Sequence, residues 1–146
     1  MTHSTKLHLP LILAVTTLFL WQLGAAPLFD VDEGAFAQAS REMLNSGDWL
    51  HTTLNGTDRF DKPILIYWFQ AGLMGLIGPY NWVARLPSAL AVLAALFMVH
   101  RFCTSQFNEQ VANRATLMLA SSLGLLSIGR AATADGLLNA LIIATT

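Results

Sequence analysis

Four apolar stretches with very few charges dominate this chain of 146 residues and limit what it can fold into. They run over residues of about 9–28, 83–100, 111–129 and 136–146. A transmembrane helix needs roughly 20 mainly apolar residues. The chain is 54% hydrophobic and 12% charged, which is about half the charge of a typical soluble protein. The sequence therefore predicts an all-α integral membrane protein.

The first and the fourth apolar stretches each leave an alternative open. Lys6 before the first is typical of a signal peptide, but no small-residue cleavage motif stands clear of the apolar run, which favours an uncleaved helix. The fourth has eleven residues, which rise only about 16 Å as a helix, about half a bilayer core. We therefore expect three complete transmembrane helices and a truncated fourth, in the N-terminal piece of a larger protein or in a truncated reading frame.

Charges around the first stretch predict the orientation. Lys6 and the amino terminus precede it, and a group of acids follows it. Basic residues are enriched on the cytoplasmic side of membrane proteins, so these flanks favour a cytoplasmic N-terminus. Counting the other basic residues by side does not support this orientation. With the N-terminus inside, residues 29–82 form an outer loop.

The outer loop, residues 29–82, is predicted to contain two helices that lie along the membrane surface. The apolar positions of the first recur at helical spacing, at Phe36, Ala39, Met43 and Leu44. Gly47 follows as a C-terminal stop. The second opens at Pro63 and closes at Gly78, which is too short to span comfortably. It contains aromatic residues typical of the lipid headgroup boundary, Tyr67, Trp68 and Phe69.

Three acids, Asp30, Asp32 and Glu33, directly follow the first apolar stretch and admit two interpretations. Asp32 and Glu33 could be an N-cap and a first-turn acid, each contributing roughly 0.5–1 kcal/mol. However, a cap needs only one acid. Crowded carboxylates beside lipid raise the pKa of at least one of them and are tolerated mainly where cations or substrates neutralise the charge. This crowding favours a functional site.

Two further motifs place charges near the same membrane face. Asp61 and Lys62, in RFDKP, precede the second loop helix. They could form a surface ion pair at a helix start, or a charge clamp in which Lys62 binds phosphate and Asp61 binds a metal ion or a hydroxyl. Arg85, in RLPS, lies at the outer end of the second span as a snorkelling side chain or as an anion contact.

Arg130 and Asp135, in GRAATADG, lie at the outer end of the third span and the start of the fourth. They could pair with each other. Alternatively, Asp135 joins Asp32, because ionisable residues in membrane bundles are functional candidates. If all three spans form, one side of the membrane carries a mixed-charge site suited to a phosphate-linked lipid substrate. Its members are Asp32, Asp61, Lys62, Arg85, Arg130 and Asp135.

Charge and cysteine content exclude other classes of protein. The net charge is −1, so nothing suggests nucleic-acid binding. The single cysteine, Cys103, excludes an internal disulfide and a cysteine-based metal site. The four histidines have no metal-ligand spacing.

The chain resembles the N-terminal region of the GT-C class of lipid-linked-sugar glycosyltransferases in DEGAFAQASREMLNSGDWLHTTLNGTDRFDKPILIYWFQAGLMGLIG and in ARLPSAL. Within that class it resembles the bacterial 4-amino-4-deoxy-L-arabinose transferases and their dolichyl-phosphate-mannose-protein-mannosyltransferase-like relatives. The similarity covers nearly the whole chain. Residues 1–146 are therefore expected to be the N-terminal part of a transmembrane glycosyltransferase domain.

The resemblance implies roles for individual residues. Asp32 and Glu33 match the acidic pair at the catalytic centre, with Asp32 as the main carboxylate that positions or deprotonates the acceptor. Asp61 matches an acid that is a candidate ligand of a metal ion or substrate, although many relatives have Glu there. Lys62 is expected to contact phosphate and Asp135 to lie near the site. The arginines of the mixed-charge site complete the expected substrate-binding residues.

The implied function is hexosyl or pentosyl transfer from a polyprenyl-phosphate carrier to a lipid or protein acceptor at the outer face of the bacterial inner membrane. The implied partners are donor, acceptor and membrane lipids, and the implied cofactor is a divalent metal ion. Members of the family are several times longer, so the isolated chain is expected to be inactive. The rival hypothesis is a non-catalytic membrane protein, such as a transporter fragment or assembly partner, that uses these acids as helix caps.

Overall fold

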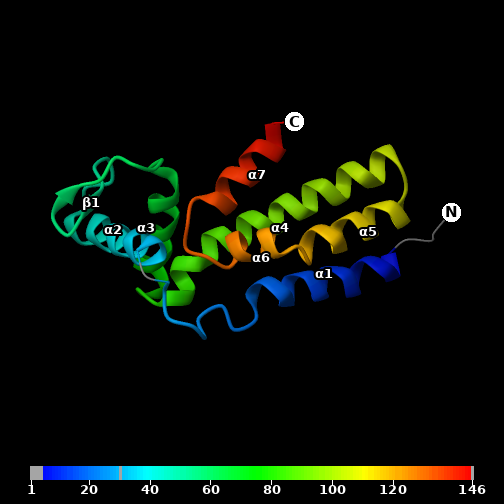
Figure 1. The fold of residues 1–146 in the computed structure, drawn as a ribbon, viewed down its shortest axis with the longest axis horizontal. Helices are drawn as coiled ribbons and strands as arrows, with labels where there is room; N and C mark the ends of the chain where they lie inside the picture. Colours follow the sequence, from blue (N-terminus) through cyan, green and yellow to red (C-terminus); the bar gives the residue numbers. More distant parts are fainter. Residues whose placement is uncertain (1–4, 30, 146) are drawn as a thin grey trace.

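The computed structural model describes residues 5–29 and 31–145, with side chains from Leu9 onward, as an elongated helical fold (Figure 1). The helices are α1 (Thr5–Leu20), α2 (Asp32–Ser46), α3 (Leu65–Ile77), α4 (Asn81–Gln106), α5 (Glu109–Ala120), α6 (Leu123–Gly129) and α7 (Asp135–Thr145). Two short antiparallel strands, β1 (Thr53–Leu54) and β2 (Thr57–Asp58), form a hairpin between α2 and α3. The prediction of a helical fold is confirmed.

The long helix α4 lies at the centre of the molecule, with the other apolar helices along it (Figure 1). It has 26 residues and extends beyond both predicted ends of the second span. In the part of the chain that the structure describes, α4 is long and apolar enough to cross a membrane, and the α5–α6 pair adds a second such segment if it is counted as one. The apolar parts of α1 and α7 are shorter.

The first helix is shorter than its apolar stretch. α1 ends at Leu20, whereas the apolar residues continue to about residue 28. Arg130 closes this helix end, because its Nη1 donates to the carbonyl of Leu18 at 2.8 Å and its Nη2 to that of Trp21 at 3.0 Å. These bonds provide partners for carbonyls that a helix C-terminus leaves unpaired. They come from a residue over a hundred positions away, so hydropathy could not predict them.

The third apolar stretch, predicted as one complete transmembrane helix, is divided into the two helices α5 and α6. α5 and α6 meet at a bend of 67°. The break falls at two serines, and Ser122 caps α6 by accepting a hydrogen bond from the backbone N–H of Leu125 at 3.4 Å. Serine side chains favour caps over helix interiors, which explains why this apolar stretch divides here.

The two helices expected in the outer loop are confirmed as α2 and α3, which pack together at one end of the molecule (Figure 1). Gly47 ends α2 with a left-handed φ of 73°, and its N–H donates to the carbonyl of Met43. The rings of Phe36 and Tyr67 stack with centroids 5.4 Å apart. α3 begins only at Leu65. The core between the two helices consists of Phe36, Ala39, Met43, Ile66, Tyr67 and Ala71.

Small residues let α7 lie close against α4. Ala91 and Ala95 of α4 pack with Ala140 of α7. A Cβ added to Gly136 would lie 3.0 Å from the backbone oxygen of Ser88. Small residues allow such close approach between helix backbones in membranes. The start of α7 is therefore held against the first half of α4.

Glu42 of α2 holds the hairpin. Its carboxylate accepts hydrogen bonds from the Thr53 hydroxyl at 2.7 Å and from the backbone N–H groups of Asn55 and Gly56 at 2.8 and 3.4 Å. A further bond comes from the Gln38 amide at 3.0 Å. The bond from Thr53, together with those from Gln38 and the two backbone groups, outweighs partial desolvation and lowers the pKa of Glu42 to about 2.

We expect the hairpin to detach from α2 in acid. Because the folded pKa of Glu42 lies below its usual 4.5, the carboxylate stabilises the hairpin above about pH 4.5, and this contribution disappears as the pH falls toward 2. In Glu42→Gln, the amides of Asn55 and Gly56 should exchange hydrogen faster than in the wild type at pH 6 and equally fast near pH 2. Glu109→Gln at the opposite end is the control. Equal exchange in wild type and Glu42→Gln at pH 6 would contradict this role.

Candidate functional site

A buried ion pair joins the start of α2 to the first half of α4. The Nε and Nη2 of Arg85 donate to the two carboxylate oxygens of Glu33 at 2.9 and 2.8 Å. The side chains of Arg85 and Glu33 are only 7% and 6% exposed. A two-pronged contact of this kind fixes orientation as well as charge.

The other N–H groups of Arg85 hold the connection between α1 and α2. Nη1 donates to the carbonyls of Leu23 and Ala26 at 2.8 and 2.9 Å, and Nη2 donates to that of Pro27 at 2.8 Å. A guanidinium has five N–H donors, and these contacts use all of them. Arg85 is therefore buried, not snorkelling, and has no N–H free for an anion in this structure.

Glu33 is equally saturated. Besides Arg85, its carboxylate accepts from the backbone N–H of Phe29 at 2.7 Å and from that of Ala132 at 2.6 Å. Burial alone raises the pKa of Glu33, but the hydrogen bonds and the positive charge of Arg85 outweigh burial and lower the pKa below its usual value. The carboxylate thus stays ionised and ties together the connection before α2, α4 and the connection between α6 and α7.

Asp32 differs from Glu33 because its side chain is exposed. It is the first residue of α2, and the N-cap position belongs to Val31, without a capping bond from its side chain. The alternative that Asp32 is the N-cap is therefore wrong, although its place in the first helical turn remains favourable for an acid. The third acid of the predicted group, Asp30, lies outside the described residues.

Arg130 and Asp135 do not pair with each other in the described part of the chain. Arg130 binds the end of α1, as described above. The exposed carboxylate of Asp135 accepts a hydrogen bond from the Thr133 hydroxyl at 3.1 Å, at the start of α7. Arg130 is thereby engaged by backbone carbonyls, while Asp135 remains accessible.

The charges of RFDKP form a separate group. Asp61 lies 3.1 Å from Nη2 of Arg59, so its ion pair is with Arg59. Arg59 also donates from Nε to the Tyr67 hydroxyl at 3.0 Å and lies over the ring of Phe36 at 5.6 Å from its centroid. Lys62 is exposed. Among the described residues, no hydrogen bond or ion pair joins Asp61 or Lys62 to Asp32.

Asp32 and Asp135 come from distant segments that meet at one end of α4. Glu33, next to Asp32, binds the backbone of Ala132, three residues before Asp135. The Ser88 hydroxyl donates to the Thr133 carbonyl at 2.8 Å, which fixes the same connection to α4. Figure 1 shows this connection and the start of α2 on the same end of the bundle as α3. The segments that carry Asp32 and Asp135 are thus joined by the hydrogen bond between Glu33 and Ala132.

Gln70 is a central polar residue that the sequence reading missed. It is fully buried and accepts from the Ser40 hydroxyl at 2.7 Å. Its amide donates to the carbonyls of Ala84 and Ala132 at 2.9 and 3.3 Å. The available signal was a lone amide in the apolar helix LIYWFQAGLMGLI. Such a residue needs partners when buried, so it marks a contact between helices.

The described residues do not form a metal site by themselves. They contain no group of three or more His, Cys, Asp or Glu side chains that could hold an ion. Asp61, the predicted metal ligand, is exposed and bound to Arg59.

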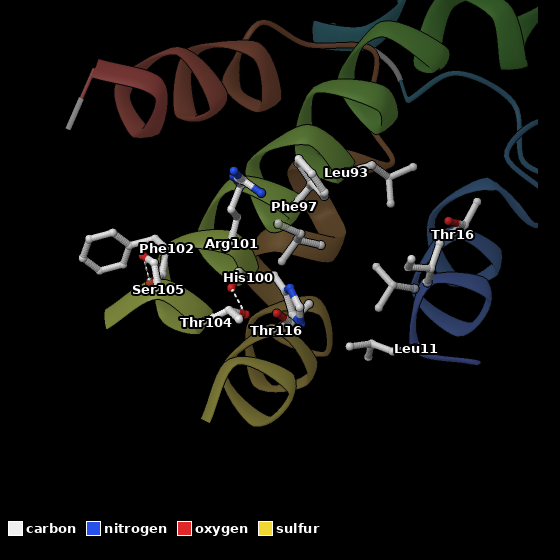
Figure 2. A pocket seen from close by; sticks show the side chains of 13 residues that line it. Leu11, Thr16, Leu93, Phe97, His100, Arg101, Phe102, Thr104, Ser105 and Thr116 are labelled. Carbon is white, nitrogen blue, oxygen red and sulfur yellow. Dashed lines mark hydrogen bonds between the residues drawn. The ribbon is translucent and has the colours of Figure 1, made fainter. Parts of the chain in front are cut away.

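A large cavity lies away from these residues. It has a volume of about 810 Å³ and lies between α1, α4 and α5. Figure 2 shows Leu11 and Thr16 of α1 across the gap from Leu93 and His100 of α4. None of the predicted site residues lines this cavity. Its walls are mostly apolar, as expected of a surface between helices in a membrane.

The sequence pattern of the dolichyl-phosphate-mannose-protein mannosyltransferase family matches residues 61–146, more than half of the chain. The chain belongs to this family. Its curated relatives include an undecaprenyl phosphate-alpha-4-amino-4-deoxy-L-arabinose arabinosyl transferase from Shewanella sediminis, 34% identical over 93% of this chain and 25% of the relative. The transferase of that name from Aeromonas salmonicida is 40% identical over 65% of this chain and 17% of the relative. The resemblance expected from the sequence is confirmed.

Two solved structures of a similar protein share the fold of this chain. ArnT from Cupriavidus metallidurans, in a crystal structure bound to undecaprenyl phosphate, matches with a TM-score of 0.88 and 26% identity over 96% of this chain and 26% of ArnT. Its apo structure matches with a TM-score of 0.84 and 25% identity over 93% of this chain and 25% of ArnT. These matches cover most of this chain but only about a quarter of the length of each relative.

Proposed function

We propose that this chain is the N-terminal part of the transmembrane domain of a glycosyltransferase of the bacterial inner membrane. The whole enzyme moves a sugar, a pentose such as an aminoarabinose, from a polyprenyl-phosphate carrier to a lipid or protein acceptor. The observation that carries the proposal is the similarity to ArnT bound to undecaprenyl phosphate, which extends over 96% of the chain. The isolated chain is expected to be inactive, because three quarters of its relatives' length lies outside the match.

Asp32 is the proposed catalytic carboxylate. An acceptor group attacks the anomeric carbon of the sugar, the bond from that carbon to the phosphate oxygen breaks, and polyprenyl phosphate leaves. Asp32 takes the proton of the acceptor group. This assignment is supported by the exposed side chain of Asp32, in contrast to the saturated carboxylate of Glu33. Asp135 is a second proposed substrate contact, because it is exposed and follows three residues after Ala132, whose backbone N–H binds Glu33 beside Asp32.

The proposed membrane arrangement combines the helices of the structure with the orientation expected from Lys6. α1, α4 and the bent α5–α6 pair each cross the bilayer, α7 begins a fourth crossing, and the N-terminus is cytoplasmic. α2 and α3 then lie at the outer surface with the acids. Asp61 remains a proposed metal ligand only as one carboxylate of a larger set that the described residues do not complete.

Lys62 is the proposed phosphate contact, and its replacement tests donor binding. In a full-length transferase whose N-terminal quarter is this chain, Lys62→Met should weaken binding of undecaprenyl phosphate about tenfold, because a hydrogen bond to a charged group contributes roughly 1.5–3 kcal/mol. Titration calorimetry in detergent micelles measures the affinity. Arg114→Met, an exposed arginine of α5, is the matched control. Wild-type affinity in Lys62→Met would remove Lys62 from the proposed site.

A further inference from the structure

We infer that Glu33 and Arg85 are a positioning pair that holds Asp32 in place for sugar transfer and do not themselves touch the substrate. The inference rests on the proposed function and assigns to both residues a role different from direct catalysis or anion binding. The hydrogen-bonding groups of both side chains are fully occupied by partners inside the protein.

The contacts of the pair leave nothing for a ligand. The guanidinium of Arg85 donates to Glu33 and to the carbonyls of Leu23, Ala26 and Pro27, which uses its five N–H groups. Both carboxylate oxygens of Glu33 accept two hydrogen bonds each. A side chain that contacts substrate would have to give up some of these buried bonds first.

The same contacts join four segments around Asp32. They connect the α1–α2 connection, the first turn of α2, α4, and the connection between α6 and α7 at Ala132. Asp32 precedes Glu33 in the chain, so the orientation of the first turn of α2 decides where its carboxylate lies. Ala132 brings the segment of Asp135 to the same anchor.

Backbone strain next to Asp32 supports an anchoring role. Val31 has φ 72° and ψ −61°, a conformation that β-branched residues rarely adopt. Such strain persists only where surrounding contacts hold it. Here the Phe29 N–H donates to Glu33 at 2.7 Å, and the Gly34 N–H donates to the Phe29 carbonyl at 3.2 Å across the strained residue.

The kinetic test uses Glu33→Gln and Arg85→Lys in the full-length transferase. In Glu33→Gln, an NH₂ group takes the place of one carboxylate oxygen and faces N–H donors, so those donors lose their acceptor. In Arg85→Lys, the charge is kept but the two-pronged contact is lost. Both variants should lower kcat about 10²-fold, the effect of a misplacement of roughly 1 Å. Their KM for the donor and their affinity for undecaprenyl phosphate should stay within about twofold of the wild type, whereas Lys62→Met changes affinity. The matched controls are Glu109→Gln in α5 and Arg101→Lys at the far end of α4.

A spectroscopic test measures position without activity. Spin labels are attached at Phe29→Cys and Leu138→Cys, two exposed positions, in a protein that also carries Cys103→Ser. They report the distance between the segment just before α2 and α7. The distance distribution should be narrow in the otherwise unchanged protein and in both controls, and broader in Glu33→Gln and Arg85→Lys. Glu33→Asp, which keeps the charge, should give an intermediate distribution and an intermediate kcat, and it serves if the other variants do not fold.

Different outcomes overturn different claims. A reduced kcat with an unchanged distance distribution would show that Glu33 acts in the chemistry itself. A tenfold loss of undecaprenyl phosphate affinity in Arg85→Lys with a near-normal kcat would show a direct phosphate contact. Wild-type kcat in Glu33→Gln, Arg85→Lys and Glu33→Asp would also overturn the positioning role. If the wild-type protein transfers no sugar, the proposed function is overturned. If the distance distribution still broadens in Glu33→Gln and Arg85→Lys, the anchoring role remains in place.

Discussion

Asp32→Asn is expected to lower kcat of the full-length transferase by about 10²–10⁴-fold, the usual contribution of general acid–base catalysis. Asparagine keeps the size of the side chain but cannot take up the proton of the acceptor. Because Asp32 is exposed and is not the N-cap of α2, its replacement should leave folding and membrane insertion unchanged. Transfer of labelled sugar from the undecaprenyl-phosphate-linked donor, assayed in membranes, measures the effect.

The control for Asp32→Asn is Glu109→Gln, which removes one negative charge at the opposite end of the bundle and should transfer sugar at the wild-type rate. Normal turnover in Asp32→Asn would refute the catalytic assignment. Absence of sugar transfer in the wild type as well as in Asp32→Asn would favour the rival hypothesis of a non-catalytic membrane protein, in which the acids only start helices.

Arg85→Met is expected to destabilise the protein by about 3–5 kcal/mol, the usual cost of removing one partner of a buried ion pair. The variant leaves the Glu33 carboxylate buried with only backbone partners, and three carbonyls lose their donor. The free energy of unfolding, measured by denaturant titration in detergent micelles, gives the effect. Arg101→Met, on the exposed far end of the same helix, should change it by less than about 0.5 kcal/mol.

The double variant Glu33→Met/Arg85→Met separates the charge from the packing. Removing both charges avoids leaving one buried alone, so the double variant should be less destabilised than the sum of the two single variants. Additive losses would mean that the two side chains do not act as a pair. A cost below about 1 kcal/mol for Arg85→Met alone would contradict its role as an anchor.

Local patterns in the sequence predicted most of the helices. The spacing of apolar residues marked α2, and Gly47 marked its end, because a residue without Cβ adopts a left-handed φ without strain. Periodicity, however, does not show where an apolar helix breaks. The bend at Ser122 and the early end of α1 depend on a side-chain cap and on Arg130, which a hydropathy pattern does not contain.

The candidate site was predicted as a set of charges, and the structure divides that set. Asp32, Lys62 and Asp135 have exposed side chains. Glu33, Arg85 and Arg130 bind backbone groups of distant segments. Both kinds of residue look the same in a sequence, because a charge beside an apolar stretch is compatible with a substrate contact and with a buried anchor.

The amino-acid sequence by itself determined the helical membrane class, the family and the presence of acids just after the first apolar stretch, because hydropathy, helix periodicity and short motifs are local properties. Only the tertiary structure showed that the Asp32 side chain is exposed, whereas the Glu33 carboxylate is buried and hydrogen-bonded. The five hydrogen bonds of Arg85 bring together the α1–α2 connection and Glu33, whose carboxylate also binds Ala132. The physical reason is that a buried charge must find all its partners inside the protein, and these partners are set by the packing of distant segments.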